Sequence, residues 1–258
     1  GDEEDEEAAM TEAWHRVFGG GPGGQQLAIH ERACIPLTRA NMKCLAHLEW
    51  LNDEVINCSL ALLQDRDAAW RGQAGRPKCH FFNTFFLNKL WKDAGTYGYK
   101  EVRRWTLPAK LKLNNQASPH VLLVDRILMP VHCGKTHWAA ACVDLARKQL
   151  LYWDSLNGTH HGVLDHLARW VADEAADKKG QPGGAEAAAR VADVASWPRV
   201  NVRPVPQQNN GCDCGVFTIK FIECASAGRE FDFSQQDIDG VRRRLCYNLL
   251  AQRMGDRL

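Results

Sequence analysis

Residues 206–217 read PQQNNGCDCGVF, a polar loop that runs directly into an apolar segment. That segment predicts a buried helix that starts at or just after Cys214. The first N–H groups of a helix have no intrahelical partner and lie at the positive end of its dipole, so they stabilise a thiolate placed there. A thiolate is the form of cysteine that attacks a carbonyl carbon. The sequence therefore predicts that Cys214 is a nucleophile.

A cysteine nucleophile needs a base, and two predicted strands earlier in the chain supply one. Residues 137–143 and 149–154 have the composition of strands and are joined by a short polar turn. If they pair as a hairpin that turns near residues 145–146, His137 lies directly opposite Asp154. A carboxylate beside an imidazole fixes its tautomer and stabilises the imidazolium. We predict that His137 is the base and that Asp154 orients it.

Gln208 precedes Cys214 in the same loop, close enough for its side-chain amide to donate to the carbonyl oxygen under attack. With the backbone N–H of Cys214 it would form an oxyanion hole, in which the loss of one donor typically lowers kcat about a hundredfold or more. A single cysteine is usually a small buried hydrophobe, and an aspartate after a strand is usually a turn residue. The prediction therefore rests on the four residues together.

A zinc site is an alternative interpretation of the same region. Cys212, Cys214, His132 and His137 are residue types that bind zinc. The paired spacing of ordinary zinc sites is missing, however, so the nucleophile is the favoured interpretation.

Composition narrows the class of protein and its compartment. Of the 258 residues 45% are apolar and 24% are charged, as in soluble globular domains, and the net charge of +1 gives no overall field that would attract nucleic acid or a membrane. The sequence has no run of about 18 apolar residues and no apolar signal-peptide core at its start. Its ten cysteines do not follow a disulfide framework. We expect mostly free thiols, a reducing compartment (nucleus or cytoplasm) and a monomer.

The chain divides into a short lead-in and one folded domain. Residues 1–26 are acidic and then glycine-rich, which predicts a flexible segment, and residues 27–258 have the composition of a globular domain. Helices are expected at 38–49 with Thr38 as the cap, from Asn52, at 81–91, at 163–176, from Cys214 and at the C-terminus, and extended segments at 121–124, 127–129, 137–143, 149–154 and 200–202. Helices and strands do not alternate as in βαβ units, so the fold class is α+β.

Several dispersed stretches of this chain resemble the SUMO-specific protease family of ubiquitin-like-protein cysteine proteases. They occur in the family's order between Thr38 and the C-terminus. The stretches are WLNDEVIN (50–57), FNTFF (82–86), VRRWT (102–106), PVH (130–132), HW (137–138), YWDS (152–155) and residues 206–215. On these matches the domain at 27–258 is identified as a member of this family.

The resemblance implies a papain-like cysteine protease fold, an α+β domain with a central mixed sheet flanked by helices. It implies a Cys–His–Asp triad and an oxyanion glutamine at Cys214, His137, Asp154 and Gln208, the four residues already reached. It also implies a thiol protease and isopeptidase that hydrolyses the bond after the C-terminal Gly-Gly of SUMO, both in precursors and in conjugates on lysine. SUMO and SUMO-conjugated proteins would be its partners, and no metal or organic cofactor is expected.

Substrate binding is also implied by the resemblance. Trp50 and Trp138 match the family's tunnel tryptophans, two flat apolar walls for a diglycine tail that has no side chains to grip. Without the family, both would be interpreted as core aromatics. The folded body of the modifier would contact other matching positions, where charges give register and aromatic residues give burial. These positions are Asp53, Phe85, Arg104, Trp105 and His132.

Two other functions remain open at this stage. A protease for another modifier, such as NEDD8, would have the same triad and would differ only in its binding surface. A non-catalytic module that binds modifier tails would keep the fold without the reaction. The presence of all four catalytic residue types counts against the second alternative.

Some segments depart from the family pattern. One extra residue lies between His132 and His137, and residues 178–196 match only loosely and receive no function. Cys212 stands where the family has a residue without a thiol, and a disulfide formed on oxidation is one hypothesis for it. Residues 242–244 are three arginines, which we interpret as a solvated helix face rather than a nucleic-acid site.

Overall fold

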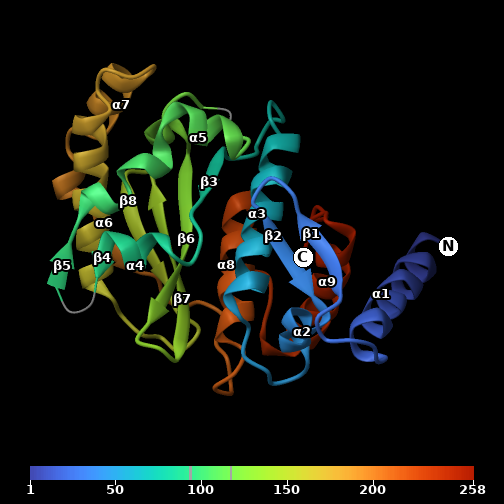
Figure 1. The fold of residues 1–258 in the computed structure, drawn as a ribbon. Coiled ribbons are helices and arrows are strands. Elements are labelled where there is room, and N and C mark those ends of the chain that lie inside the picture. The colour runs from blue at the N-terminus through green and yellow to red at the C-terminus, as the bar shows by residue number, and fades with distance from the viewer. Residues whose placement is uncertain (93–94, 117) are drawn as a thin grey trace.

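Helix α8 (Cys214–Ala227) lies between a β-sheet and a group of helices, so that the two halves of the molecule pack against its opposite sides (Figure 1). The structure, a computed structural model, describes residues 1–92, 95–116 and 118–258. Every residue of α8 is buried, as expected for a helix that is apolar nearly all round. Among the described residues, no helix is long and apolar enough to cross a membrane.

The sheet has five strands in the following spatial order: β3 (Cys79–Phe81), β6 (Arg126–Cys133), β7 (His137–Asp144), β8 (Gln149–Trp153) and β9 (Arg199–Asn201). The three central strands pair antiparallel, whereas β3 and β9 each pair parallel to their neighbour. The sheet is therefore mixed. With helices on both of its faces, it confirms the α+β fold class predicted from the sequence.

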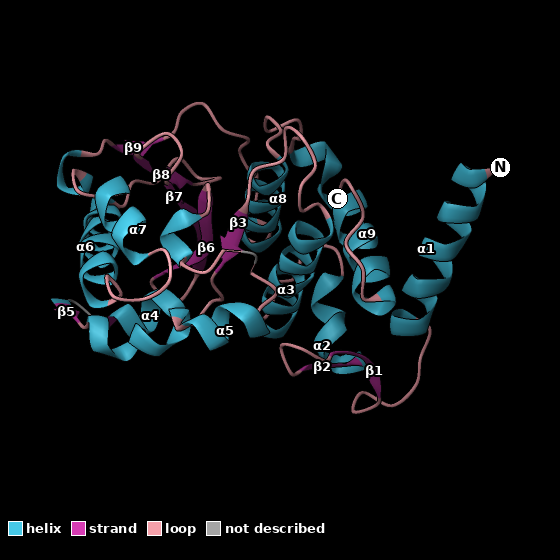
Figure 2. Cartoon of the chain, turned by 90° about the horizontal axis from the view of Figure 1, so that it is seen from above, coloured by secondary structure: helices cyan, strands magenta, loops and turns pink. Residues whose placement is uncertain are grey.

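Figure 2 shows which helices cover each face of the sheet. On one side lie α6 (His161–Asp177) and α7 (Gly184–Arg190). On the other side lies α8, followed by α3 (Asp53–Ala69) and α9 (Ile238–Ala251). The remaining short elements are β1 (Gln26–His30), β2 (Ile35–Thr38), α2 (Arg39–Met42), α4 (Phe86–Leu90), β4 (Trp91–Lys92), β5 (Thr96–Tyr97) and α5 (Pro108–Leu113).

Strand β7 is buried on both faces because two hydrophobic cores share it. Alternate residues belong to the core around α8 and to the core beneath α6, in the sets Trp138, Ala140, Cys142 and Ala139, Ala141, Val143. Three consecutive alanines in the strand leave room for helices to approach from either side. Of its two end residues, Asp144 is buried and His137 is partly exposed.

Three predicted elements differ from the observed ones. Thr38 caps a helix as expected, but α2 ends after one turn and continues as a 3-10 helix over Lys43–Leu45. The run 81–91 contains only the short helix α4, because Phe81 ends strand β3 and the backbone N–H of Phe82 donates to the Leu128 carbonyl of β6 at 3.0 Å. Residues 121–123 form a 3-10 helix rather than an extended segment. Apolar content predicts burial more reliably than it predicts backbone conformation.

The first part of the chain contains a helix where the sequence predicted a flexible lead-in. Helix α1 (Asp2–Phe18) packs against α9 and buries Met10, Ala13 and Val17. These residues recur at intervals of three and four, which is the spacing of one helix face. The prediction of a flexible segment rested on the acidic residues 2–7, whose side chains lie on the exposed part of the helix.

Arg242 is buried, which contradicts the prediction of a solvated arginine face at residues 242–244. Its guanidinium pairs with Asp213, the residue directly before α8, at 2.7 Å. Arg243, by contrast, is partly exposed and pairs with Glu7 of α1 at 2.7 Å. Arg242 also donates to three backbone carbonyls of the segment before Trp50, those of Cys44, Ala46 and Glu49. One side chain of α9 therefore fixes both the start of α8 and a neighbouring loop.

Asp213 receives further hydrogen bonds that keep it ionised. Asn210 and Gln235 donate to its carboxylate at 2.7 and 2.8 Å. Burial by itself would raise the pKa of Asp213, but the hydrogen bonds from Asn210, Arg242 and Gln235 and the charge of Arg242 lower it below its usual value. The carboxylate is therefore charged and paired at neutral pH.

We predict that Arg242→Ala lowers the free energy of unfolding by about 3 to 5 kcal/mol, because it leaves the Asp213 charge buried without its partner. Chemical denaturation followed by circular dichroism measures this change. Arg243→Ala is the matched control, since its exposed pair with Glu7 contributes only about 0 to 1 kcal/mol. Equal losses in the two variants would contradict the assignment of Arg242 as a buried clamp.

Candidate active site

Cys214 is the first residue of α8, and its side chain lies at the positive end of that helix. It is only 3% exposed, so it lies almost entirely inside the protein. Gly215 lies against Leu51, where an added Cβ would stand 3.1 Å from the Leu51 Cβ. The glycine thus allows the loop that carries Trp50 to approach the start of α8.

His137 joins Cys214 to Asp154. Nε2 of His137 lies 2.8 Å from Oδ1 of Asp154, which leaves Nδ1 for the thiol. The hydrogen bond with Asp154, followed by one with Cys214, raises the pKa of His137 to about 9, although burial opposes the shift. The imidazole is therefore an imidazolium at neutral pH, a cation that stabilises a thiolate beside it.

Asp154 lies just beyond the end of β8 and is buried. Its Oδ1 also accepts a hydrogen bond from the backbone N–H of Leu156 at 2.8 Å. Burial alone would raise the pKa of Asp154, but the hydrogen bonds from His137 and Leu156 lower it below its usual value. The carboxylate is therefore negative at neutral pH, where His137 is protonated.

The strand register differs from the predicted one by two residues. Ala140 pairs with Trp153 and Asp144 with Gln149, so His137 and Asp154 are diagonal neighbours and not directly opposite. The turn is longer than expected, because it occupies residues 145–148 and places Lys148 at a positive φ of 54°. A shift of two residues leaves side chains on the same face of the strand, which is why the pair still meets.

Gln208 is held beside these residues by Ser155. Its backbone N–H donates to the Ser155 carbonyl at 3.0 Å, and the Ser155 hydroxyl donates to its Oε1. Nε2 of Gln208 donates to the Asn210 carbonyl at 2.5 Å. Since a carbonyl only accepts, this contact fixes the amide with its nitrogen on the Asn210 side. Ser155 belongs to the stretch YWDS (152–155), but no pattern in the sequence indicated that it holds Gln208 in place.

The two predicted tunnel tryptophans differ in exposure. Trp50 is 52% exposed, whereas Trp138 is buried and its ring stacks on His132 with centroids 4.1 Å apart. His132 also lies near Asp53, whose pKa it lowers while burial raises it overall. Despite the extra residue between His132 and His137, His132 lies beside Trp138 and Asp53.

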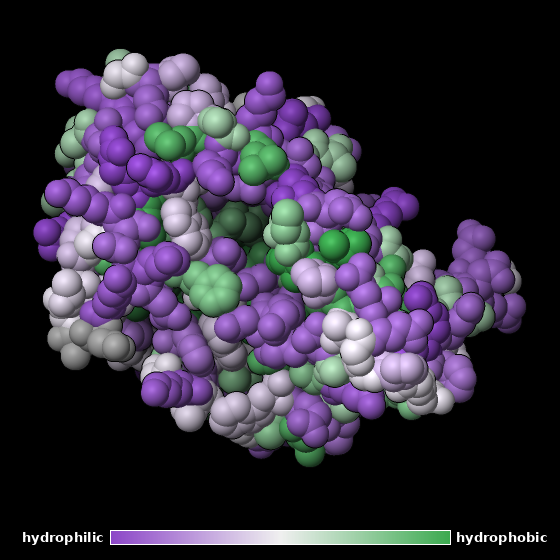
Figure 3. All heavy atoms as spheres, viewed as in Figure 1, coloured by the Kyte–Doolittle hydropathy of each residue, from purple (hydrophilic) through white to green (hydrophobic). Residues whose placement is uncertain are grey.

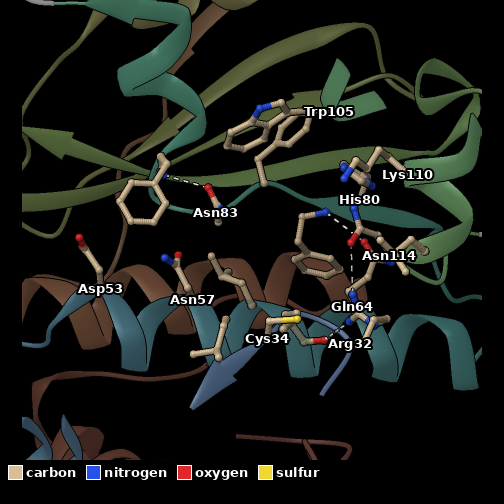
Figure 4. A pocket seen from close by; sticks show the side chains of 18 of the residues that line it. Arg32, Cys34, Asp53, Asn57, Gln64, His80, Asn83, Trp105, Lys110 and Asn114 are labelled. Carbon is tan, nitrogen blue, oxygen red and sulfur yellow. Dashed lines mark hydrogen bonds between the residues drawn. The ribbon is translucent and has the colours of Figure 1, made fainter. Parts of the chain in front are cut away.

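A cavity of about 840 Å³ lies between α3, β3 and α5 and contains four of the predicted contacts for a modifier body, Asp53, Phe85, Arg104 and Trp105. Figure 3 shows this face hollowed near its centre, with hydrophobic residues inside and mostly hydrophilic ones around it. Figure 4 shows the cavity extending from Asp53 at one end to Arg32 and Lys110 at the other. No pattern in the sequence indicated this second end, because its residues come from segments far apart in the chain.

The two neighbouring arginines of the VRRW stretch have different partners. Arg103 pairs with Asp177 at 3.2 Å. Arg104 lines the cavity and makes no side-chain hydrogen bond or ion pair within the described residues. Of the two, Arg104 is therefore the cation available to a ligand.

The metal alternative gains no support from the structure. Within residues 1–92, 95–116 and 118–258, no group of three or more His, Cys, Asp or Glu side chains is arranged to hold a metal ion. Cys212 is half-buried, and all ten cysteines of the chain are free thiols. The role of Cys212 on oxidation stays a hypothesis.

Comparison with known proteins assigns the chain to a family. The model of the Ulp1 protease family, C-terminal catalytic domain, matches residues 49–254. This chain belongs to the Ulp1 protease family. The ubiquitin-like-specific protease ESD4 of Arabidopsis thaliana is 39% identical over 97% of this chain and 46% of its own length. Sentrin-specific protease 2 of Homo sapiens is 30% identical over 91% of this chain and 35% of its own length.

Solved structures agree with this assignment. The C-terminal Ulp1 protease domain, solved in complex with Smt3, the yeast orthologue of SUMO, superposes with a TM-score of 0.72 and 25% identity, covering 95% of each chain. This Ulp1-family chain spans less than half the length of the two curated relatives named above. The family model that matches is that of a C-terminal catalytic domain.

We predict that His137 titrates near pH 9 and that Asp154→Asn moves its pKa down towards 6.5, because the largest cause of the shift is removed. Since folding raises this pKa, His137 stabilises the fold fully below pH 6.5, and that contribution is lost as the pH rises through about 9. NMR of the histidine ring signals measures both values. If His137 titrates at 6.5 in the unmodified protein, its hydrogen bond with Asp154 is contradicted.

Proposed function

We propose that this chain is a cysteine protease that hydrolyses the bond after the C-terminal Gly-Gly of SUMO, in precursors and in isopeptide conjugates. The observation that carries the proposal is the placement of His137 between Asp154 and Cys214. Cys214 is the first residue of a buried helix, and Gln208 lies in the loop that leads to it. Membership of the Ulp1 family supports the same reaction.

The proposed reaction starts with attack of the Cys214 thiolate on the carbonyl carbon of the terminal glycine. The backbone N–H of Cys214 and the amide of Gln208 donate to the oxyanion that forms. His137, oriented by Asp154, protonates the leaving amine of lysine. It then removes a proton from water, which attacks the thioester and releases the modifier.

The proposed specificity has two parts. The tail lies between Trp50 and Trp138, where glycine is the only residue that leaves enough room. The folded body of the modifier contacts the cavity, in which Phe85 is exposed for burial and Arg104 is free to pair with an acidic group. His132, stacked on Trp138, connects the two parts.

A reducing compartment suits this chemistry, and we place the protein in the nucleus or cytoplasm. A thiolate nucleophile and nine further free thiols support this placement, because such cysteines form disulfides in oxidising compartments.

The experiment that tests the proposed function uses SUMO, NEDD8 and ubiquitin, each with a C-terminal fluorogenic amide. We predict rapid release from SUMO and none in a Cys214→Ser variant. Release from NEDD8 alone would keep the mechanism and overturn the substrate. If the chain binds SUMO but releases no fluorophore from any substrate, it is a non-catalytic binding module and not a protease.

We further predict that Arg104→Ala raises KM for the SUMO substrate about tenfold with little change in kcat, because Arg104 contacts the modifier body and not the reacting bond. Arg103→Ala is the matched control, since Arg103 is already paired with Asp177. Steady-state kinetics measures both constants. A KM for Arg104→Ala equal to that of the control would exclude this contact.

A further inference from the structure

Tyr152 touches the candidate triad, although neither the sequence patterns nor the proposed reaction assigns it a role. The residue lies in β8 and is only 2% exposed. Its hydroxyl stands 3.3 Å from Oδ2 of Asp154 and 3.2 Å from Sγ of Cys133. It is therefore the one tyrosine of the described residues whose hydroxyl is hydrogen-bonded to Asp154.

The strand register explains how these groups come together. In an antiparallel pair, residues directly opposite each other point to the same face of the sheet. Cys133 pairs with His137, and Tyr152 pairs with Ala141, which lies on the same face as His137. Asp154 follows Tyr152 by two residues and so shares that face. One end of the sheet thus presents a thiol, an imidazole, a phenol and a carboxylate together.

The direction of each hydrogen bond follows from the chemistry. A carboxylate only accepts, so the Tyr152 phenol donates to Oδ2 of Asp154, and the Cys133 thiol is left to donate to the phenol oxygen. Burial, followed by the nearby Cys133 and Asp154, raises the pKa of Tyr152, which keeps the phenol protonated as a donor. Oδ1 of Asp154 is then left for His137 and for the N–H of Leu156.

Asp154 has little freedom to take another orientation. A Cβ added at Gly158 would collide with Oδ2, so the backbone of Gly158 closes the side of the carboxylate next to the phenol. The two oxygens consequently have different and fixed partners. If the phenol were absent, Oδ2 would lose the only side-chain donor that the described residues give it.

We propose that Tyr152 is a positioning residue of this protease: its hydroxyl holds the carboxylate of Asp154 so that the other oxygen meets Nε2 of His137. The proposal rests on the proposed function, because it assigns Tyr152 to the same triad. Misalignment of a reacting group slows the chemical step without weakening the binding of substrate. Tyr152 acts through Asp154 and does not contact the reacting bond.

The test is Tyr152→Phe, which removes the hydroxyl and keeps the ring. We expect kcat for the SUMO substrate to fall about tenfold, the effect of losing one hydrogen bond to a charged group, with KM unchanged. In an Asp154→Ala background the same substitution causes no further loss, because the residue through which it acts is gone. Tyr97→Phe is the matched control, since Tyr97 donates to Asp173 at 2.6 Å away from the site.

A second readout needs no modifier and so separates this proposal from the proposed function. Alkylation of Cys214 by iodoacetamide, followed by mass spectrometry across the pH range, reports the thiolate that His137 stabilises. We expect Tyr152→Phe to change this pH profile and Tyr97→Phe to leave it as in the parent. If the parent alkylates at Cys214 but cleaves no modifier, the proposed function fails and this comparison still decides the role of Tyr152.

Three outcomes would overturn the proposal. The first is a kcat of Tyr152→Phe within twofold of the parent together with an unchanged alkylation profile. The second is a fall in kcat on Tyr152→Phe that is as large in the Asp154→Ala background as in the parent. The third is a tenfold loss in Cys133→Ala, which would place the effect in the packing of this face instead of in the hydroxyl. Thermal unfolding of each variant establishes that the comparison is made between folded proteins.

Discussion

The buried ion pair between Arg242 and Asp213 anchors the residue directly before α8, and the rest of the site is built against that helix start. A charge buried at this place is tolerated only if its partner and hydrogen bonds are all present. Arg242 meets this condition by donating to Asp213 and to three carbonyls of the loop before Trp50. It also neutralises Asp213, whose charge would otherwise oppose a thiolate at the neighbouring Cys214.

The two halves of the molecule contribute different parts of the site. The helical half supplies Cys214 and Trp50, while the sheet half supplies His137 and Asp154 at the ends of β7 and β8. The site residues of the two halves come together at the first turn of α8, while the rest of α8 packs against β6 and β7. Because strands and a buried helix are more rigid than loops, this arrangement keeps the distance between thiol and imidazole constant. The loop that carries Gln208 is attached to the sheet half through Ser155.

The residues proposed for catalysis and the cavity proposed for binding are separate, because none of Cys214, His137 and Asp154 lines the cavity. The groups around Cys214 are buried, and the hydrogen bonds between them raise the pKa of His137 and keep Asp154 ionised against the effect of burial. The cavity beside them is open, and its arginine at position 104 has no partner among the described residues. Paired charges in the first region tune reactivity, whereas an unpaired charge in the second is available to a macromolecule.

Local patterns in the sequence determined the α+β class, the helix that starts at Cys214 and the shared face of His137 and Asp154, because helical and strand periods depend only on neighbouring residues. The family resemblance added the fold type. Contacts between distant segments were decided by the tertiary structure: the two-residue shift in register, the burial of Arg242, the choice of Arg104 over Arg103 and the contact of Tyr152 with Asp154. Each of these contacts depends on how whole elements pack against one another, and the residue pattern within a single element does not determine that packing.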